Sequence, residues 1–434
     1  MIILRTVKNI SSLNIAASVL LFLAAILAAV VANSSLSPVY QDFLLQELHL
    51  RIGNFNLFSH GGHPLKMIEF INDCLMTVFF LAVGLEIKRE LLVGELSSVR
   101  KAALPFIAAC GGMVVPVVIY ALSVASGTPE TRGMAIPMAT DIAFSLGVLS
   151  LLGKRVPLSL KIFLTAFAVV DDIGGILVIA LFYSADVAYG YLIAAAVLYV
   201  FLYYMGKFGV TQKIFFLFFG VIIWYLFLQS GIHSTISGVI LAFVIPARPR
   251  LDAGKYIERI RDIIGEFPLS KSDNIVLTNA QIATLKQVER ASDYVISPLQ
   301  SLEDNLHGAV SFVILPLFAF ANAGVVFSGS GSIVGDVSIA VAAGLLLGKF
   351  LGIYLFTWLA VKSGVALMPA GMNWKNIAGV SLLGGIGFTV SLFIANLSFA
   401  DEYPELLNQA KFGVLVGTVL AGVLGYVVLN WVLP

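Results

Sequence analysis

The feature that most constrains this chain is a series of long apolar runs that follow one another along almost its whole length. A helix needs about 20 mostly apolar residues to cross a bilayer, and only helices and closed barrels can cross it. The runs are continuous rather than alternating, so they predict a helical bundle. We expect about twelve spans, near residues 13–31, 67–86, 103–124, 134–152, 158–183, 187–205, 213–229, 232–246, 307–327, 337–361, 376–397 and 412–432.

The composition agrees with a protein that has the lipid bilayer as its solvent. Hydrophobic residues make up 59% of the chain and charged residues 12%, whereas soluble domains are about a quarter charged. The net charge of +1 points to no nucleic acid and no acidic partner. We therefore expect one all-α membrane domain over residues 1–434 without a cofactor.

The distribution of Lys and Arg predicts the orientation of the chain. The first apolar run, 13–31, is longer than a signal-peptide core of about 7–15 residues, so we expect an uncleaved span. Placing the N-terminus inside leaves only Arg51, Lys66, Arg132 and Lys411 in the outer loops. The positive-inside rule then places both termini in the cytoplasm, and we expect a multi-pass protein of a bacterial inner membrane.

Two hydrophilic segments interrupt the apolar runs. Residues 32–66 are expected to form a periplasmic loop, in which Gly53-Asn54 between short apolar runs is typical of a β-hairpin. An irregular loop is an equally good interpretation. Residues 247–304 are expected to form a long cytoplasmic loop with an amphipathic helix near Ile257 and Ile264. This loop is either regulatory or a tolerated surface insertion.

Five charged residues lie inside the apolar runs, where each costs at least about 2.5–3.5 kcal/mol. Such residues usually mark ion pathways, so all five are candidates for the functional site. They are Asp73, Asp141, Asp171, Asp172 and Lys349.

Asp171 and Asp172 are adjacent in the fifth span. Neighbouring helical residues point about 100° apart, so the two carboxylates face different surroundings and can have different roles. Two close carboxylates in a dry site do not both ionise easily, and a proton and a hard cation therefore compete for them. That competition is what an ion exchanger needs. The alternative is a pair of acids that only hold helices together, which a single Asn would do at lower cost.

Two spans carry signs of a break in the membrane. Pro137 removes a backbone donor just before Thr140 and Asp141 in the fourth span. The eleventh span contains a matching glycine cluster, Gly384, Gly385 and Gly387. Interrupted spans at corresponding positions indicate the binding site of an inverted-repeat transporter, with spans 3–5 and 10–12 as the repeats. Taken alone, the glycines are equally compatible with close helix packing.

The half-helix ends at such breaks carry partial charges. Asp141 is expected to neutralise facing N-termini, and Lys349 facing C-termini. A buried Lys must also pair or lose its proton, and we expect Asp171 or Asp172 as its partner. Long apolar stretches flank Lys349 on both sides. We therefore do not expect its side chain to extend to the membrane surface.

The remaining polar residues have two interpretations each. Asp73 either caps a helix or belongs to the site, and His233 is similarly ambiguous. A cluster at the expected cytoplasmic mouth either senses pH through its histidine or forms a solvated charged face. This cluster consists of Glu86, Arg89, Glu90, Glu303 and His307.

Two other classes of protein use buried acids. A cation channel would carry rings of acids along an open pore, whereas here the acids are few, deep and accompanied by a Lys. An intramembrane aspartyl protease would carry a GxGD motif. Asp336 follows Gly335, but Ile333 occupies the other glycine position, so we expect no enzyme activity.

Seven stretches of the chain resemble the NhaA family of bacterial sodium/proton antiporters. They cover nearly all the spans in order, and their combination is specific. The stretches are INDCLMTVFFLAVGLEIKREL (71–91), ATDIAFSLGVLSLLGKRVPLSLKIFL (139–164), VVDDIGG (169–175), SGIHSTISGVI (230–240), LPLFAFANAGV (315–325), LLGKFLGI (346–353) and GVSLLGGIGFTVSLFIA (379–395).

The resemblance implies two crossed, interrupted helices, the fourth and eleventh spans. It implies that Asp172 is the principal ligand of a transported Na⁺ or Li⁺, and that Asp171 carries protons together with Lys349. Thr140 and Asp141 would support this assembly. It further implies electrogenic exchange, activation at alkaline pH through the cluster at the mouth, and a homodimer held partly by the hairpin near Gly53.

Two departures from the family pattern affect the cytoplasmic side. The loop 247–302 is longer than expected, and Asp304 stands where a His is common. The pH threshold is therefore the property that the resemblance predicts least well.

Overall fold

The computed structural model is almost entirely helical and describes residues 2–53, 55–60, 63–183, 187–248, 253–267, 276–327, 332–400 and 402–433. The α-helices are α1 (Ile2–Ala32), α2 (Ser37–Leu45), α3 (Met67–Phe70), α4 (Met76–Val93), α5 (Val99–Ser123), α6 (Ile142–Leu151), α7 (Leu158–Phe182), α8 (Tyr189–Lys207), α9 (Lys213–Leu228), α10 (Thr235–Val244), α11 (Ala253–Gly265), α12 (Asn279–Val295), α13 (Pro298–Ala309), α14 (Leu315–Asn322), α15 (Asp336–Ala343), α16 (Lys349–Lys362), α17 (Trp374–Leu383), α18 (Phe388–Phe399) and α19 (Pro404–Val432). Three 3₁₀ segments, η2 (Glu95–Ser97), η3 (Pro129–Met138) and η4 (Gly153–Arg155), and three π-helical turns, η1 (Ile71–Leu75), η5 (Val310–Ile314) and η6 (Gly344–Gly348), complete the helical elements.

The described residues include eight helical stretches that are long and apolar enough to cross a membrane, and ten if each of two bent pairs counts as one span. The eight are Ile15–Ala32, Met67–Val93, Val99–Ser123, Leu158–Phe182, Tyr189–Lys207, Pro298–Asn322, Asp336–Lys362 and Pro404–Val432. The two remaining expected spans, 213–229 and 232–246, form the apolar helices α9 and α10. Their 16 and 10 residues are fewer than a full crossing needs.

The two bent pairs occur where the sequence predicts broken helices. In the fourth expected span, η3 and α6 meet at 45°, and in the eleventh, α17 and α18 meet at 44°. Three other spans are continuous but contain a π-helical turn, namely η1 before α4, η5 before α14 and η6 before α16. A π-helical turn inserts one residue into a helix and often lies at a functional site. The turn η6 directly precedes Lys349.

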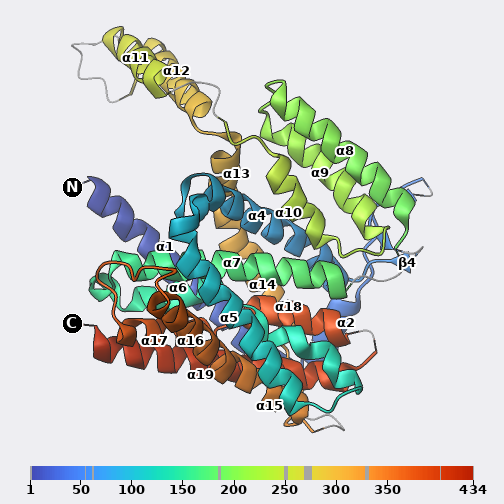
Figure 1. Cartoon of the computed structure of the whole chain (residues 1–434). Coiled ribbons are helices and arrows are strands. Elements are labelled where there is room, and N and C mark those ends of the chain that lie inside the picture. Colours follow the sequence, from blue (N-terminus) through green and yellow to red (C-terminus); the bar gives the residue numbers. More distant parts are fainter. Residues whose placement is uncertain are drawn as a thin grey trace.

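Helix α7, which carries Asp171 and Asp172, is the most enclosed of the eight continuous spans. In its most apolar stretch 67% of the residues are buried, against 44% or fewer in each of the other seven. It contacts α4, α5, α6 and α17. Figure 1 shows α7 running through the middle of the bundle, with both chain ends on the left of the view and the β-strands on the right.

The segment 32–66 contains more structure than the sequence suggests. Strands β1 (Arg51–Ile52) and β2 (Phe55–Asn56) pair antiparallel across Gly53, as the hairpin pattern predicts. A second antiparallel pair, β3 (Ser59–His60) and β4 (His63–Pro64), and the helix α2 were not predicted. The hydroxyl of Tyr40 in α2 donates to the carbonyl of Phe320 at 2.6 Å and so anchors this segment to α14.

The segment 247–304 is also largely helical. It contains α11 and α12, which pack against each other, and the start of α13, which begins at Pro298 and leads into the ninth expected span. The sequence placed this helix start near residue 307, so that boundary was wrong; the capping side chain of Ser297 and the Pro at the first helical position explain the earlier start. In Figure 1 the α11–α12 pair projects away from the bundle, and Ile257 and Ile264 are exposed.

Candidate functional site

The break in the fourth expected span presents Asp141 at the start of a half-helix. Residues between η3 and α6 are extended, and Asp141 is the N-cap of α6. Its Oδ1 accepts a hydrogen bond from the Phe144 N–H at 2.9 Å. Asp141 and Thr140 are both buried, with 3% and 1% of their surfaces exposed. The carboxylate therefore satisfies an otherwise unpaired donor of a buried helix end.

The break in the eleventh expected span faces the first one. The Thr389 hydroxyl donates to Asp141 Oδ2 at 2.6 Å, and the Thr389 N–H donates to the same oxygen at 3.3 Å. Thr389 lies in the first turn of α18, so one carboxylate caps the N-termini of both α6 and α18. This geometry agrees with the expectation that Asp141 neutralises two facing N-termini.

Hydroxyl groups bind the carbonyls at the end of α17. Thr140 Oγ1 donates to the Gly384 carbonyl at 2.8 Å, and Ser145 Oγ donates to the Leu383 carbonyl at 3.0 Å. From the sequence, Lys349 was expected to neutralise the facing C-termini of the half-helices. In the described structure these carbonyls are instead bound by hydroxyls of the partner break, and Lys349 donates elsewhere.

The glycines at the second break allow close packing. The carbonyl of Ile386 accepts the Asp141 N–H at 2.6 Å, which joins the two breaks through their backbones. A Cβ on Gly385 would collide with the carbonyl oxygen of Leu345, and one on Gly387 would collide with the Ser391 hydroxyl. Both interpretations of the glycine cluster therefore apply, because the helix is interrupted there and is also closely packed.

Lys349 forms an ion pair with the first of the two adjacent acids. Its Nζ lies 2.7 Å from Asp171 Oδ2, and neither side chain has any exposed surface. The ring of Phe167 lies 5.6 Å from the same ammonium group. The other oxygen, Asp171 Oδ1, has no hydrogen-bond partner among the described residues. Asp171 thus holds one strong contact and one free acceptor position.

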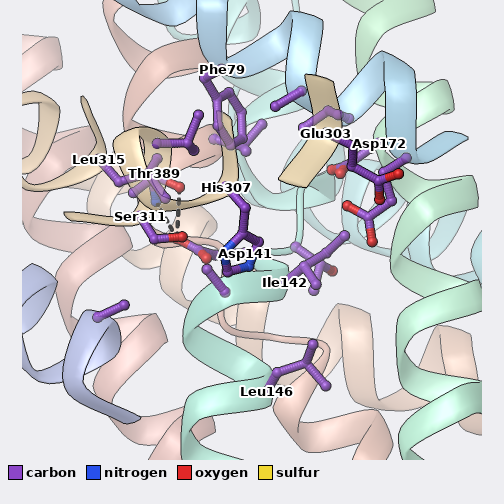
Figure 2. A pocket seen from close by; sticks show the side chains of 18 of the residues that line it. Phe79, Asp141, Ile142, Leu146, Asp172, Glu303, His307, Ser311, Leu315 and Thr389 are labelled. Carbon is purple, nitrogen blue, oxygen red and sulfur yellow. Dashed lines mark hydrogen bonds between the residues drawn. The ribbon is translucent and has the colours of Figure 1, made fainter. Parts of the chain in front are cut away.

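Asp172 lies in different surroundings. It lines a cavity of about 290 Å³, together with Thr140, Asp141 and Thr389. Asp171 and Lys349 do not line this cavity. Figure 2 shows the Asp172 carboxylate on the side of the pocket opposite Asp141 and Thr389. Carboxylate and hydroxyl oxygens are the ligands that a hard monovalent or divalent cation prefers, so this cavity can receive one.

The predicted charged cluster opens onto the same cavity. Glu86, Arg89, Glu303 and His307 all line it, and Figure 2 shows Glu303 and His307 beside it. Arg89 Nε bonds Glu303 at 2.9 Å, which connects α4 to α13. Glu90 does not line the cavity; it pairs with Arg89 at 3.1 Å and accepts the Glu95 N–H at 3.0 Å. Asp304 is exposed and also lies outside the lining.

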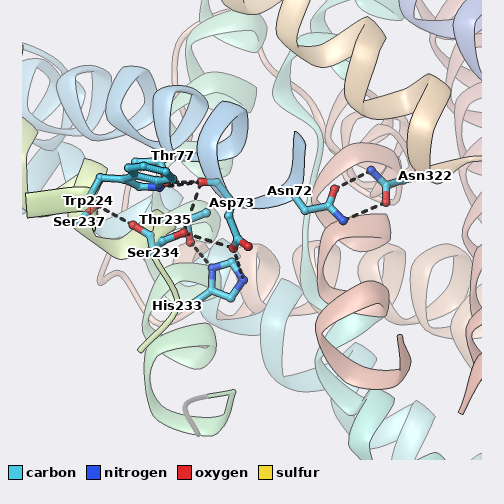
Figure 3. A network of polar contacts seen from close by, with 9 residues as sticks. All are labelled: Asn72, Asp73, Thr77, Trp224, His233, Ser234, Thr235, Ser237 and Asn322. Carbon is cyan, nitrogen blue, oxygen red and sulfur yellow. Dashed lines mark hydrogen bonds and ion pairs between the residues drawn. The ribbon is translucent and has the colours of Figure 1, made fainter. Parts of the chain in front are cut away.

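Asp73 and His233 lie together away from the cavity. Asp73 is inside the π-helical turn η1, and Lys66, not Asp73, is the residue that precedes the helix there, so the capping interpretation of Asp73 is wrong. Its carboxylate lies 3.2 Å from the Ser234 hydroxyl and 3.5 Å from His233 Nε2. Figure 3 shows this network.

Several polar residues at the site were not predicted. Besides Thr389 and Ser145, an amide network joins three spans: Asn72 and Asn322 exchange hydrogen bonds, and Asn396 donates to Asn322 at 2.9 Å. Figure 3 shows the Asn72–Asn322 pair beside Asp73. Only Thr389 had a local signal, because a hydroxyl residue shortly after a glycine cluster is typical of a new helix start.

Comparison with known proteins identifies the family of this chain. The model of the family described as Na+/H+ antiporter 1 matches residues 8–429. The Na(+)/H(+) antiporter NhaA of Bacteroides fragilis is 75% identical over 434 residues, covering 100% of this chain and 99% of that protein. The NhaA of Parabacteroides distasonis is 51% identical, covering 100% and 97%.

Among solved structures, the sodium proton antiporter MjNhaP1 from Methanocaldococcus jannaschii aligns with 100% of this chain and 98% of its own. The TM-score is 0.48 and the identity 12%, below the level at which a shared fold is defined. The family model and the curated relatives each extend over nearly the whole chain. The chain is therefore a multi-pass membrane protein that belongs to the Na+/H+ antiporter 1 family.

Proposed function

We propose that this chain is an electrogenic secondary transporter that expels Na⁺ or Li⁺ and admits a larger number of protons, for sodium and pH homeostasis. Sodium/proton antiport follows from the family; the charge imbalance and its residues are our proposal. One structural observation supports this proposal most directly. Two adjacent carboxylates have separate surroundings, because Asp172 lines the cavity while Asp171 is sealed against Lys349.

Asp172 binds the transported cation. Its side chain lines the cavity and is buried, and Thr140 and Asp141 line the same space. Asp141 already accepts three hydrogen bonds, from Phe144 and Thr389. It therefore acts as a fixed negative charge that holds the two breaks together, while Asp172 is free to exchange a proton for a cation.

Asp171 and Lys349 carry the additional proton. An ion pair without solvent contact is stable only while both members are charged. Protonation of Asp171 removes its charge and breaks the pair, and the free acceptor at Oδ1 is the position at which that proton binds. Cation binding at the neighbouring Asp172 adds positive charge beside Lys349 and favours release of a proton from the pair. Exchange then moves net charge.

Alternating access depends on the two broken helices. We propose twelve spans in a single domain, with inverted repeats formed by spans 3–5 and 10–12 and with the fourth and eleventh spans crossing at their breaks. The matched bends of 45° and 44° and the hydrogen bonds between the breaks support this arrangement. The excess of Lys and Arg in one set of loops, with both chain ends on one side in Figure 1, supports cytoplasmic termini.

Regulation by pH takes place at the mouth of the cavity. Arg89 on α4 pairs with its neighbour Glu90 and also with Glu303 on α13, so the second pair joins the two helices. Glu86 and His307 line the same cavity. A change in the protonation of Glu303 or His307 alters this bridge and the field at the entrance. The long cytoplasmic loop 247–304, which includes the exposed Asp304, adjoins this mouth. The pH threshold of transport therefore depends on this loop as well.

The surroundings of the chain complete the proposal. We place it in the bacterial inner membrane, with residues 32–66 in the periplasm. We propose a homodimer in which the β1–β2 hairpin contributes contacts between the two copies, because short paired strands offer edges that a second copy can join. The helices α11 and α12 belong to the cytoplasmic side.

Transport in liposomes tests the proposal. Purified full-length protein is reconstituted, a pH gradient is imposed, and luminal pH is recorded after addition of Na⁺, Li⁺ or K⁺, with and without valinomycin to clamp the potential. We expect proton movement with Na⁺ and Li⁺ that responds to the clamp. Proton movement that is insensitive to the clamp contradicts electrogenic exchange, and its absence from pH 6 to 9 in folded protein contradicts antiport.

A further inference from the structure

A second, larger cavity lies in a different part of the bundle. It is bounded by α5, η3, α7 and α18 and has a volume of about 1110 Å³. None of its lining residues lines the ion cavity. Drug-sized molecules occupy pockets of about 300–1,000 Å³, so this space is large enough for an extended organic ligand.

The wall of this cavity is mostly apolar and open toward the bilayer. Met113 and Val117 from α5 and Val178 from α7 line it. Val114 and Leu177 lie at its mouth, and more than half of each of these side chains is exposed. Because α5 and α7 are membrane-span candidates, these exposed side chains contact hydrocarbon rather than water. An apolar cavity with such a mouth excludes water and admits an acyl chain.

The cavity becomes polar at one end. Thr131, Arg132, Tyr183 and Ser398 line that end. The Tyr183 hydroxyl donates to the Arg132 carbonyl at 2.7 Å and lies 3.1 Å from the Ser398 hydroxyl. Arg132 lies in the first half of η3 and Tyr183 directly follows the last residue of α7, and the end of a spanning helix is where a bilayer changes from hydrocarbon to head groups. The cavity therefore has an apolar body and a polar end at the depth expected for a lipid.

Arg132 at the polar end forms an ion pair with Glu402, which lies beside the cavity and does not line it. Arg132 Nη1 lies 2.9 Å from Glu402 Oε2, and about half of each side chain is exposed, 51% and 56%. The guanidinium group also lies 5.4 Å from the Tyr403 ring centre. Arg binds phosphate well through its remaining donors, and a carboxylate accepts hydrogen bonds from an ammonium group. A phosphoethanolamine head group presents that pair of charges at a short separation.

We propose that this crevice binds one phospholipid of the surrounding bilayer, with an acyl chain along α5 and α7 and a phosphoethanolamine head group on Arg132 and Glu402. The bound lipid contacts η3 and α18, which are one half of each bent span. It therefore fills the space beside the two elements that carry the helix breaks.

Thermal stability of the delipidated protein measures this binding. The full-length protein is stripped in detergent and supplied with phosphatidylethanolamine, phosphatidylcholine or phosphatidylglycerol. We expect phosphatidylethanolamine to raise the melting temperature by at least about 3 °C more than either other lipid. The choline head group cannot donate hydrogen bonds to Glu402, and the glycerol head group has no cation for it.

Variants of the crevice separate this site from general lipid effects. Val114→Trp and Leu177→Trp fill the mouth from opposite walls, and each should remove the preference for phosphatidylethanolamine. Arg132→Gln should remove it as well. The matched controls are Leu122→Trp, which is exposed on α5 outside the crevice, and the exposed Arg100→Gln; both should keep the preference.

Native mass spectrometry gives the second readout, as the number of lipids retained. Wild-type protein should retain one phosphatidylethanolamine that both Trp variants lose. An equal or larger stabilisation by phosphatidylglycerol overturns the proposal. Retention of the preference and of the bound lipid in both folded Trp variants overturns it too.

Discussion

The two adjacent aspartates of α7 are chemically identical and differ only in what surrounds them. Asp172 lines a cavity that also contains Glu86 and His307, whereas Asp171 is closed off and bonded to Lys349 at 2.7 Å. One residue of helical rotation, about 100°, produces this difference. The difference teaches that two neighbouring carboxylates can have separate surroundings when different helices face each of them, and our proposal assigns cation binding to one and proton carrying to the other.

The largest effect is expected from Asp172, the member of the pair that lines the cavity. Asp172→Asn keeps the volume of the side chain but removes the negative charge that binds the cation. We expect complete loss of sodium-dependent proton movement in liposomes. Glu47→Gln, at an exposed position outside the cavity, is the control and should transport normally. Retained transport in Asp172→Asn would remove this residue as the main ligand.

For Asp171, the member of the pair that is closed off from the cavity, we expect the main effect on thermal stability. Lys349→Met leaves Asp171 buried without its partner, and breaking a buried pair costs about 3–5 kcal/mol. We expect a clearly lowered melting temperature. The double variant Asp171→Asn/Lys349→Met removes both charges and should recover most of the loss. If the single and double variants melt alike, the ion pair does not hold α7 against α16.

Asp141 provides an intermediate case, since it lines the cavity and is also fully bonded. Thr389→Val removes the hydroxyl that donates to Asp141 at 2.6 Å while keeping the shape of the side chain. Loss of one charge-assisted hydrogen bond corresponds to about 1.5–3 kcal/mol. We expect a Na⁺ affinity weakened by roughly tenfold or more, measured as the Na⁺ concentration for half-maximal transport. Thr284→Val on α12 is the matched control.

The smallest effects concern two histidines. His233 lies outside the lining of the ion cavity, and its ring packs against Phe393. His233→Gln should therefore leave the pH dependence of transport unchanged from pH 6 to 9. His307 lies at the mouth beside Glu303, and His307→Gln should shift the pH of half-activation. Identical pH profiles for wild type and His307→Gln would exclude this histidine as a sensor.

Much of the architecture could be predicted from local pattern. Long apolar runs marked the spans, and Pro137 and the glycine cluster marked both breaks, because each feature acts within one helical segment. The start of α13 was harder, since an early helix cap depends on a few residues. The antiparallel pairing at Gly53 was recognisable because a turn signal is local.

Contacts between distant segments could not be derived in the same way. Residue chemistry alone left Asp171 and Asp172 as equal partners for Lys349, and only the family resemblance favoured Asp171. The structure places Lys349 against Asp171, on a helix that packs against α5. Thr389 and Asp141 are 248 residues apart, and so are beyond any local pattern. The amide network of Asn72, Asn322 and Asn396 also joins segments that are far apart in the sequence, so no local pattern predicts it.

The most direct test of the separation between the two aspartates is charge movement in Asp171→Asn. Proteoliposomes on a solid-supported membrane receive a Na⁺ concentration jump, and the transient current is compared with proton movement recorded by dye. The account predicts that Asp171→Asn loses most of the current at equal protein density while Na⁺ still binds at Asp172. A current equal to that of the wild type would contradict the assignment of the second proton to Asp171 and Lys349.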